Sequence, residues 1–119
     1  MIIGKTFYFD AAHQLPDEKC YGKCSNLHGH TYQLIVEIEG DVNKEGWVMN
    51  FKDLKNIIQE RVINILDHSL INKVINIPTA ENMVLWIKEQ IEESIKKHNC
   101  KISMLKLYET PTSYAKIKG

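Results

Sequence analysis

The 119-residue sequence predicts an α+β fold, in which a four-stranded, mostly antiparallel sheet carries two helices on one face. Residues 2–13 and 28–39 alternate between apolar and polar side chains, as half-buried strands do. Between residues 50 and 98 the apolar positions recur at helical spacing instead. Two further strand-like runs, 102–109 and 113–118, complete the order strand, strand, helix, helix, strand, strand (ββααββ).

Two amphipathic helices are expected between the second and third strands. Asn50 can cap the first helix and Thr79 the second, because both side chains accept hydrogen bonds from backbone N–H groups. The apolar stripe of the first helix is Leu54, Ile57, Ile58, Val62, Ile65 and Leu66. The stripe of the second is Met83, Val84, Ile87, Ile91 and Ile95. Each stripe needs an apolar surface to cover it, and the sheet supplies one.

The third strand is less regular than the first two. In run 102–109 one face is expected to carry Ser103, Leu105, Leu107 and Glu109. The opposite face would carry Ile102, Met104, Lys106 and Tyr108. Both edges of the sheet should be open, and open edges favour pairing between copies of a chain. We therefore expect a homo-oligomer joined through its sheet edges.

Composition narrows the class of protein. Fifteen Lys and Arg balance fifteen Asp and Glu, so the formal net charge is zero. This argues against broad binding of nucleic acid or of an acidic membrane. No apolar run is long enough to span a bilayer, and residues 1–5 do not resemble a signal peptide. We therefore expect a cytoplasmic protein with reduced cysteines, and, because no linker interrupts residues 1–119, a single domain.

Strand parity predicts that three histidines meet. His28 and His30 are two residues apart at the start of one strand, so both point to the same face. His13 ends the preceding strand with the parity of Phe7 and Phe9. If the two strands pair antiparallel across the polar loop 14–27, the three imidazoles come together at one end of one face.

Three imidazoles of this kind predict a zinc site with one open position, which is typical of a catalytic centre. Two alternatives remain open from the residues alone. The histidines could be ordinary surface or core residues. Alternatively, Cys20 and Cys24 could join His28 and His30 in a closed Cys2His2 site, which would leave His13 unexplained.

Other residues could carry acid–base chemistry. Cys24 lies shortly before His28, and a nearby zinc ion would lower the pKa of its thiol. The adjacent Asp67 and His68 could form a general acid–base pair or an ordinary helix end. Glu109 closes the third strand on the face of Leu105 and Leu107. Its carboxylate could accept two parallel N–H bonds from a heterocycle, or it could simply be solvated.

Five motifs together resemble one enzyme family almost from end to end. They are Phe9-Asp10-Ala11-Ala12-His13, Cys24-Ser25-Asn26-Leu27-His28-Gly29-His30, Leu66-Asp67-His68, Pro78-Thr79-Ala80-Glu81-Asn82 and Tyr108-Glu109-Thr110-Pro111-Thr112-Ser113. In this order they resemble the 6-pyruvoyl-tetrahydropterin synthase / 6-carboxytetrahydropterin synthase family.

The resemblance implies more than the spacing does. It implies the tunnelling fold, in which trimers close a β-barrel, two trimers stack as a hexamer, and active sites lie between subunits. It implies 7,8-dihydroneopterin triphosphate as the substrate and zinc as the cofactor. The implied zinc ligands are His13, His28 and His30. Cys24 would be the catalytic base, Asp67 and His68 the second proton-transfer pair, Glu109 the pterin anchor, and Thr79 part of the segment that contacts the pterin.

Within the family, the short gap from Cys24 to His28 resembles the branch that forms 6-carboxy-5,6,7,8-tetrahydropterin and releases acetaldehyde and triphosphate. Its pathway is the synthesis of queuosine and related 7-deazaguanines. Two other readings compete with this one. The first is the pyruvoyl-forming synthase, which would use the same residues. The second is a non-catalytic, zinc-stabilised binding domain.

Overall fold

The two long N-terminal strands pair along their whole length. In the computed structural model, which describes residues 1–119, β1 (Ile2–His13) runs antiparallel to β2 (His28–Glu39). The register runs from Ile2 opposite Glu39 to His13 opposite His28. Both predicted strands are confirmed with the predicted bounds. Every second side chain of each strand therefore points toward the same layer.

The sheet has five strands in the order β3-β1-β2-β4-β5, so the predicted α+β class is confirmed but the predicted count of four is wrong. β4 (Lys101–Thr110) and β5 (Ser113–Lys118) continue it antiparallel beyond β2. The missed strand, β3 (Ser69–Leu70), pairs parallel with Ala11 and Ala12 of β1. Its two residues are too few to show alternation.

The predicted faces of the third strand are wrong at one residue. Pairing with β2 shifts register where Glu37 lies opposite Met104 and Ile38 opposite Ile102. Ser103 is the extra residue of this bulge. An extra residue reverses the parity of whatever precedes it. Ile102 is therefore buried on the same face as Leu105 and Leu107, which explains why the sequence looks apolar on both sides.

The first long helix begins as predicted and then changes pitch. α2 (Phe51–Ile58) passes into a π-helical segment (Gln59–Ile63) and then α3 (Asn64–Leu66). A π turn holds more residues than an α turn, so the apolar stripe rotates around the helix. As a result Ile63 is buried, whereas Ile65, predicted to be in the stripe, is 39% exposed.

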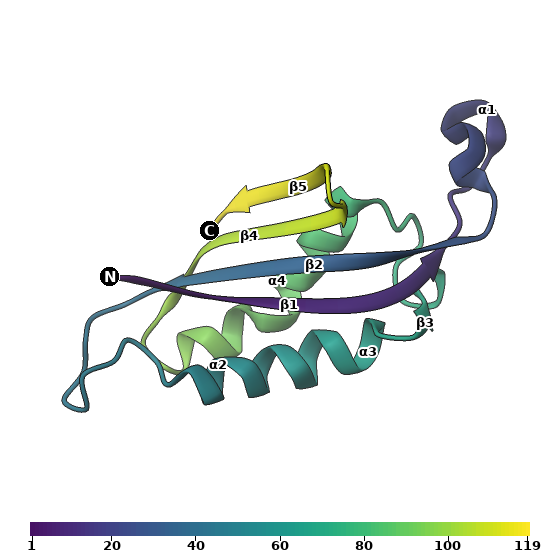
Figure 1. Ribbon diagram of the computed structural model, residues 1–119. Coiled ribbons are helices and arrows are strands. Elements are labelled where there is room, and N and C mark those ends of the chain that lie inside the picture. The colour runs from purple at the N-terminus through teal and green to yellow at the C-terminus, as the bar shows by residue number, and fades with distance from the viewer.

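The second long helix is α4 (Ala80–Lys96), and all five predicted stripe residues are fully buried. Figure 1 shows α2, α3 and α4 on the same side of the sheet. Loop 14–27 projects beyond the sheet and contains α1 (Glu18–Tyr21) and a 3₁₀ turn (Gly22–Ser25); a second 3₁₀ turn (Ile71–Lys73) follows β3. None of the helices has the length and apolar character needed to cross a membrane.

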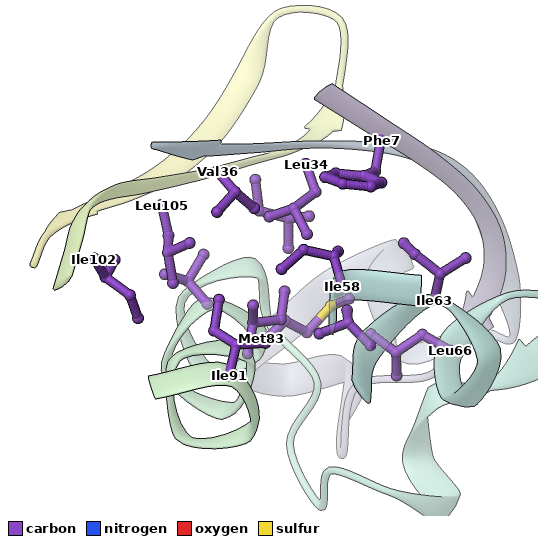
Figure 2. Close-up of a cluster of buried hydrophobic side chains, with 14 of the residues drawn as sticks. Phe7, Leu34, Val36, Ile58, Ile63, Leu66, Met83, Ile91, Ile102 and Leu105 are labelled. Atoms are coloured by element: carbon purple, nitrogen blue, oxygen red, sulfur yellow. The ribbon is translucent and has the colours of Figure 1, made fainter. Parts of the chain in front are cut away.

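The core fills the space between the sheet and the helices. Phe7, Leu34 and Val36 point down from β1 and β2 toward Ile58 and Met83 (Figure 2). Twenty-five buried residues form this one cluster. Burying a side chain of this size stabilises the fold by roughly 1.5–3 kcal/mol. The register of β1 against β2 is fixed by this core, because a slip by one residue would expose its apolar side chains.

A substitution at Asn50 tests whether this residue caps the first helix. Its side chain accepts a hydrogen bond from the Lys52 N–H at 2.9 Å, as an N-cap does. Asn50→Ala should lower the free energy of unfolding by about 1 kcal/mol, since one N–H of the first turn loses its partner. Urea unfolding at fixed protein concentration measures this. Asn50→Asp is the matched control and should stay near the wild type. An unchanged midpoint for Asn50→Ala would contradict the assignment.

Candidate metal centre and pterin site

The structure brings the three predicted histidines together. His13 at the end of β1 lies opposite His28, and Ala11 lies opposite His30, at the start of β2. One ring nitrogen from each histidine lies within 4.8 Å of the others. His13 is only 1% exposed, and His30 is 19% exposed. The convergence expected from strand parity is thus present in the fold.

Backbone carbonyls fix how two of the rings are protonated. His13 Nδ1 lies 2.8 Å from the carbonyl oxygen of Pro78, and His28 Nδ1 lies 2.6 Å from that of Asn26. A carbonyl only accepts, so both Nδ1 atoms carry a hydrogen and donate it. In a neutral imidazole this leaves Nε2 with a free lone pair. The two Nε2 atoms lie 2.9 Å apart, and two lone pairs at this distance repel unless a cation lies between them.

The third ring supplies a further sign of a missing partner. His30 Nε2 is buried and has no hydrogen-bond partner. Burial lowers the pKa of His30, and the neighbouring His13 and His28 lower it further, against a raising effect of Glu109. A neutral, buried ring nitrogen without a partner is costly. Binding a metal ion would satisfy it, so the three residues fit a divalent cation such as zinc.

Glu109 is a fourth predicted residue that lies beside this cluster. Its Oε1 atom lies 3.6 Å from His13 Nε2 and 3.8 Å from His30 Nε2. Glu109 also lines a hollow of about 550 Å³ together with His30, Tyr8, Gln33 and Tyr108. This volume is typical of small-molecule sites. The carboxylate therefore lies at the boundary between the histidines and a cavity of ligand size.

Tyr32 is a site residue that the sequence analysis did not assign. Its hydroxyl lies 3.4 Å from His13 Nδ1, and its ring stacks on Phe9 with centroids 5.0 Å apart. Burial raises the pKa of Tyr32, and Glu109 raises it further, so the hydroxyl stays protonated. Strand parity could have identified this residue, because Tyr32 continues the face of His28 and His30. It forms the floor of the cluster.

Asp67 and His68 form a pair of their own on the other side of β1. Asp67 Oδ2 lies 3.0 Å from His68 Nδ1, and Asp67 Oδ1 accepts a hydrogen bond from the Asp10 N–H at 3.0 Å. That backbone bond, more than the bond from His68, holds the pKa of Asp67 below its usual range. His68 has a φ of 57° and donates its own N–H to the Asp10 carbonyl at 2.6 Å. Pairing of β3 with β1 thus holds the two residues in place.

Two hollows meet at β2. The second, of about 620 Å³, is lined by His68 and Asp10 and shares Gly29, His30 and Thr31 with the first. The histidine cluster and the Asp67–His68 pair therefore border neighbouring cavities of one protomer.

The remaining predicted residues lie outside both hollows. Cys24 is exposed on the 3₁₀ turn, and its carbonyl accepts from the Leu15 N–H at 3.0 Å. Thr79 caps α4 by accepting from the Asn82 N–H at 3.2 Å. Neither Cys20 nor Cys24 belongs to the histidine cluster. The closed Cys2His2 site considered above is therefore wrong: His13, not a cysteine, joins His28 and His30.

Comparison with known proteins agrees with this geometry. A sequence model of the family described as 6-pyruvoyl tetrahydropterin synthase matches residues 2–119. A putative 6-carboxy-5,6,7,8-tetrahydropterin synthase of Archaeoglobus fulgidus is 46% identical over 93 residues, covering 78% of this chain and 77% of that protein. A dihydroneopterin monophosphate aldolase of Pyrococcus furiosus is 41% identical over 101 residues, covering 85% and 82%.

A solved structure shows the same fold. The Caenorhabditis elegans 6-pyruvoyl tetrahydropterin synthase matches with a TM-score of 0.89 at 24% identity, covering 100% of this chain and 95% of that one. The subunit fold implied by the resemblance is thereby confirmed. With the match over almost all of its length, the chain belongs to the 6-pyruvoyl tetrahydropterin synthase family, whose enzymes are lyases that act on pterins.

Proposed function

We propose that this protein is a zinc-dependent 6-carboxy-5,6,7,8-tetrahydropterin synthase. It would convert 7,8-dihydroneopterin triphosphate to 6-carboxytetrahydropterin with release of acetaldehyde and triphosphate, in the cytoplasmic synthesis of queuosine and related 7-deazaguanines. The observation that carries the proposal is the convergence of three histidine nitrogens beside a ligand-sized hollow. The relative named for this reaction, 46% identical, supports the choice of product.

The proposed metal site uses His13, His28 and His30, whose Nδ1–H groups or burial leave Nε2 free to bind. Zinc held there would act as a Lewis acid that polarises the hydroxyl and carbonyl groups of the substrate side chain. The carbonyls of Pro78 and Asn26 orient two of the rings, which keeps the ligand geometry in place before substrate arrives.

Proton transfer is assigned to Cys24 and to the Asp67–His68 pair. Cys24 as thiolate would remove a proton from the side chain of the substrate, and His68, oriented by Asp67 at 3.0 Å, would deliver or accept the next one. Glu109 would accept N–H bonds from the pterin ring, with the Thr79 segment beside it.

We further propose that the protein acts as a homo-oligomer, a trimer or a hexamer, of single-domain subunits with sites between them. Cys24 and Thr79 lie outside both hollows of one protomer, which favours a site that a second chain completes. The open edges of β5 and of most of β1 offer unpaired backbone groups for such contacts.

Product analysis tests the reaction. The purified protein incubated with 7,8-dihydroneopterin triphosphate should release acetaldehyde together with triphosphate. A pyruvoyl product without acetaldehyde would replace the proposal with the pyruvoyl-forming reaction. A parallel incubation with dihydroneopterin monophosphate covers the third reaction named among the relatives. Cleavage of the monophosphate in preference to the triphosphate would identify an aldolase.

Two variants should distinguish the residues that bind metal from a residue that acts only in catalysis. His28→Ala removes one of three ligands, so bound zinc and activity should both be lost. Cys24→Ala leaves the ligands intact, so zinc should stay near one equivalent per chain while activity falls by about 10²-fold or more. Elemental analysis and an acetaldehyde assay measure the two quantities. Full activity in a metal-free sample, or an active Cys24→Ala variant, would contradict the mechanism.

The Asp67–His68 pair predicts an activity deficit over a wide pH range when the carboxylate is removed. The depressed pKa of Asp67 keeps its carboxylate ionised at every pH above its ordinary value of about 3.9, so it is charged throughout pH 5–8. Asp67→Asn should therefore lower kcat, on the order of 10-fold to 10²-fold, at both ends of this range. Bound zinc should not change. A carbon NMR titration of the wild type in which the Asp67 carboxyl gains a proton between pH 5 and 8 would contradict the structure.

A further inference from the structure

We infer that Glu109 is a fourth ligand of the metal ion, closing the site when no substrate is bound and leaving it when substrate enters. The inference rests on the proposed metal-dependent function and adds to it a resting state of the site. In that state, the coordination position expected to be open is occupied by a carboxylate of the same chain.

The position of Glu109 is the first argument. Glu109 shares the inner face of β4 with Leu105 and Leu107, and it follows directly on the stretch that pairs with β2. Its carboxylate approaches His13 and His30, and it makes no hydrogen bond or ion pair to any other side chain. The strand therefore places the carboxylate beside the histidine cluster, and no other ion pair competes for it.

The distances are the second argument. In a tetrahedral zinc site with bonds of about 2.0–2.1 Å, neighbouring ligand atoms lie about 3.3 Å apart. Glu109 Oε1 is 3.6 Å from His13 Nε2 and 3.8 Å from His30 Nε2, which is near this spacing. It lies farther from His28, outside the cluster of the three ring nitrogens, so a small turn of the Glu109 side chain would complete the ligand set. The same separations are too long for hydrogen bonds, whose N···O distances lie at about 2.7–3.2 Å. A cation shared with His13 and His30 therefore explains these two approaches better than a direct N–H···O contact does.

The third argument is that the cavity gives the Glu109 carboxylate a second position, away from the metal site. Glu109 lines the 550 Å³ cavity as well as the cluster, and it is 28% exposed, so the carboxylate can turn from the histidines toward a ligand. A heterocycle in the cavity would offer N–H donors to the carboxylate, while the hydroxyls of its side chain would take the vacated metal position. One carboxylate would thereby couple pterin binding to the opening of the metal site.

Metal titration without substrate tests this inference. Zinc affinity is measured by competition with a chromophoric chelator, and the visible bands of the cobalt-substituted protein report the ligand set. Glu109→Gln should weaken zinc binding on the order of tenfold or more and should change the cobalt bands, because an amide is a poorer ligand than a carboxylate. Glu37→Gln is the control, since it removes a carboxylate from the outer face of the same sheet.

The outcomes are distinct. If wild type binds metal and Glu109→Gln matches it in affinity and cobalt spectrum, the inference is wrong while the proposed function stands. If wild type binds no metal at all, the proposed function itself fails. If circular dichroism shows that Glu109→Gln does not fold, Glu109→Asp replaces it, because its side chain is shorter by one methylene. Weakened zinc binding with an altered cobalt spectrum in this variant supports the inference. Wild-type affinity and spectrum overturn it.

Discussion

The register of β1 against β2 is the constraint on which the site depends. His13 lies opposite His28 at the last paired position, and the same ladder keeps Phe7 beside Leu34 in the core. A shift of one residue would turn the apolar side chains to the surface and move His13 to the other face. The hydrophobic core therefore holds the histidines at the place where they meet, and the carbonyls of Pro78 and Asn26 then orient two of the rings.

Much of this arrangement was predictable because period two is visible in a sequence. The bounds of β1 and β2, the caps at Asn50 and Thr79, and the meeting of the histidines all follow from local patterns. The parts that were missed depend on single residues out of pattern. Ser103 forms a bulge that moves Ile102 to the core, and a π turn buries Ile63 in place of Ile65. Neither irregularity leaves a compositional mark.

The groups that orient the rings could not be predicted for a different reason. His13 and His28 donate to the carbonyls of Pro78 and Asn26, and a carbonyl belongs to every residue regardless of its side chain. In the same way, Asp67 is held by the backbone N–H of Asp10, which became its neighbour only through the two-residue strand β3. Tertiary structure supplies these contacts, so periodicity identifies the three histidines without identifying what fixes their tautomers.

The layout of the site also bears on how one family can carry names for different reactions. The histidines and Glu109 lie on strands of the sheet that pack against the core. The pairing register of these strands fixes their relative positions. Cys24 lies on a projecting 3₁₀ turn, and His68 lies next to a two-residue edge strand. Elements at the periphery tolerate change more easily than a paired ladder does. Under the proposed function, a change of reaction would therefore arise most easily at these peripheral groups. The same thiol and imidazole would be kept, and their position relative to the bound side chain would decide which bond breaks.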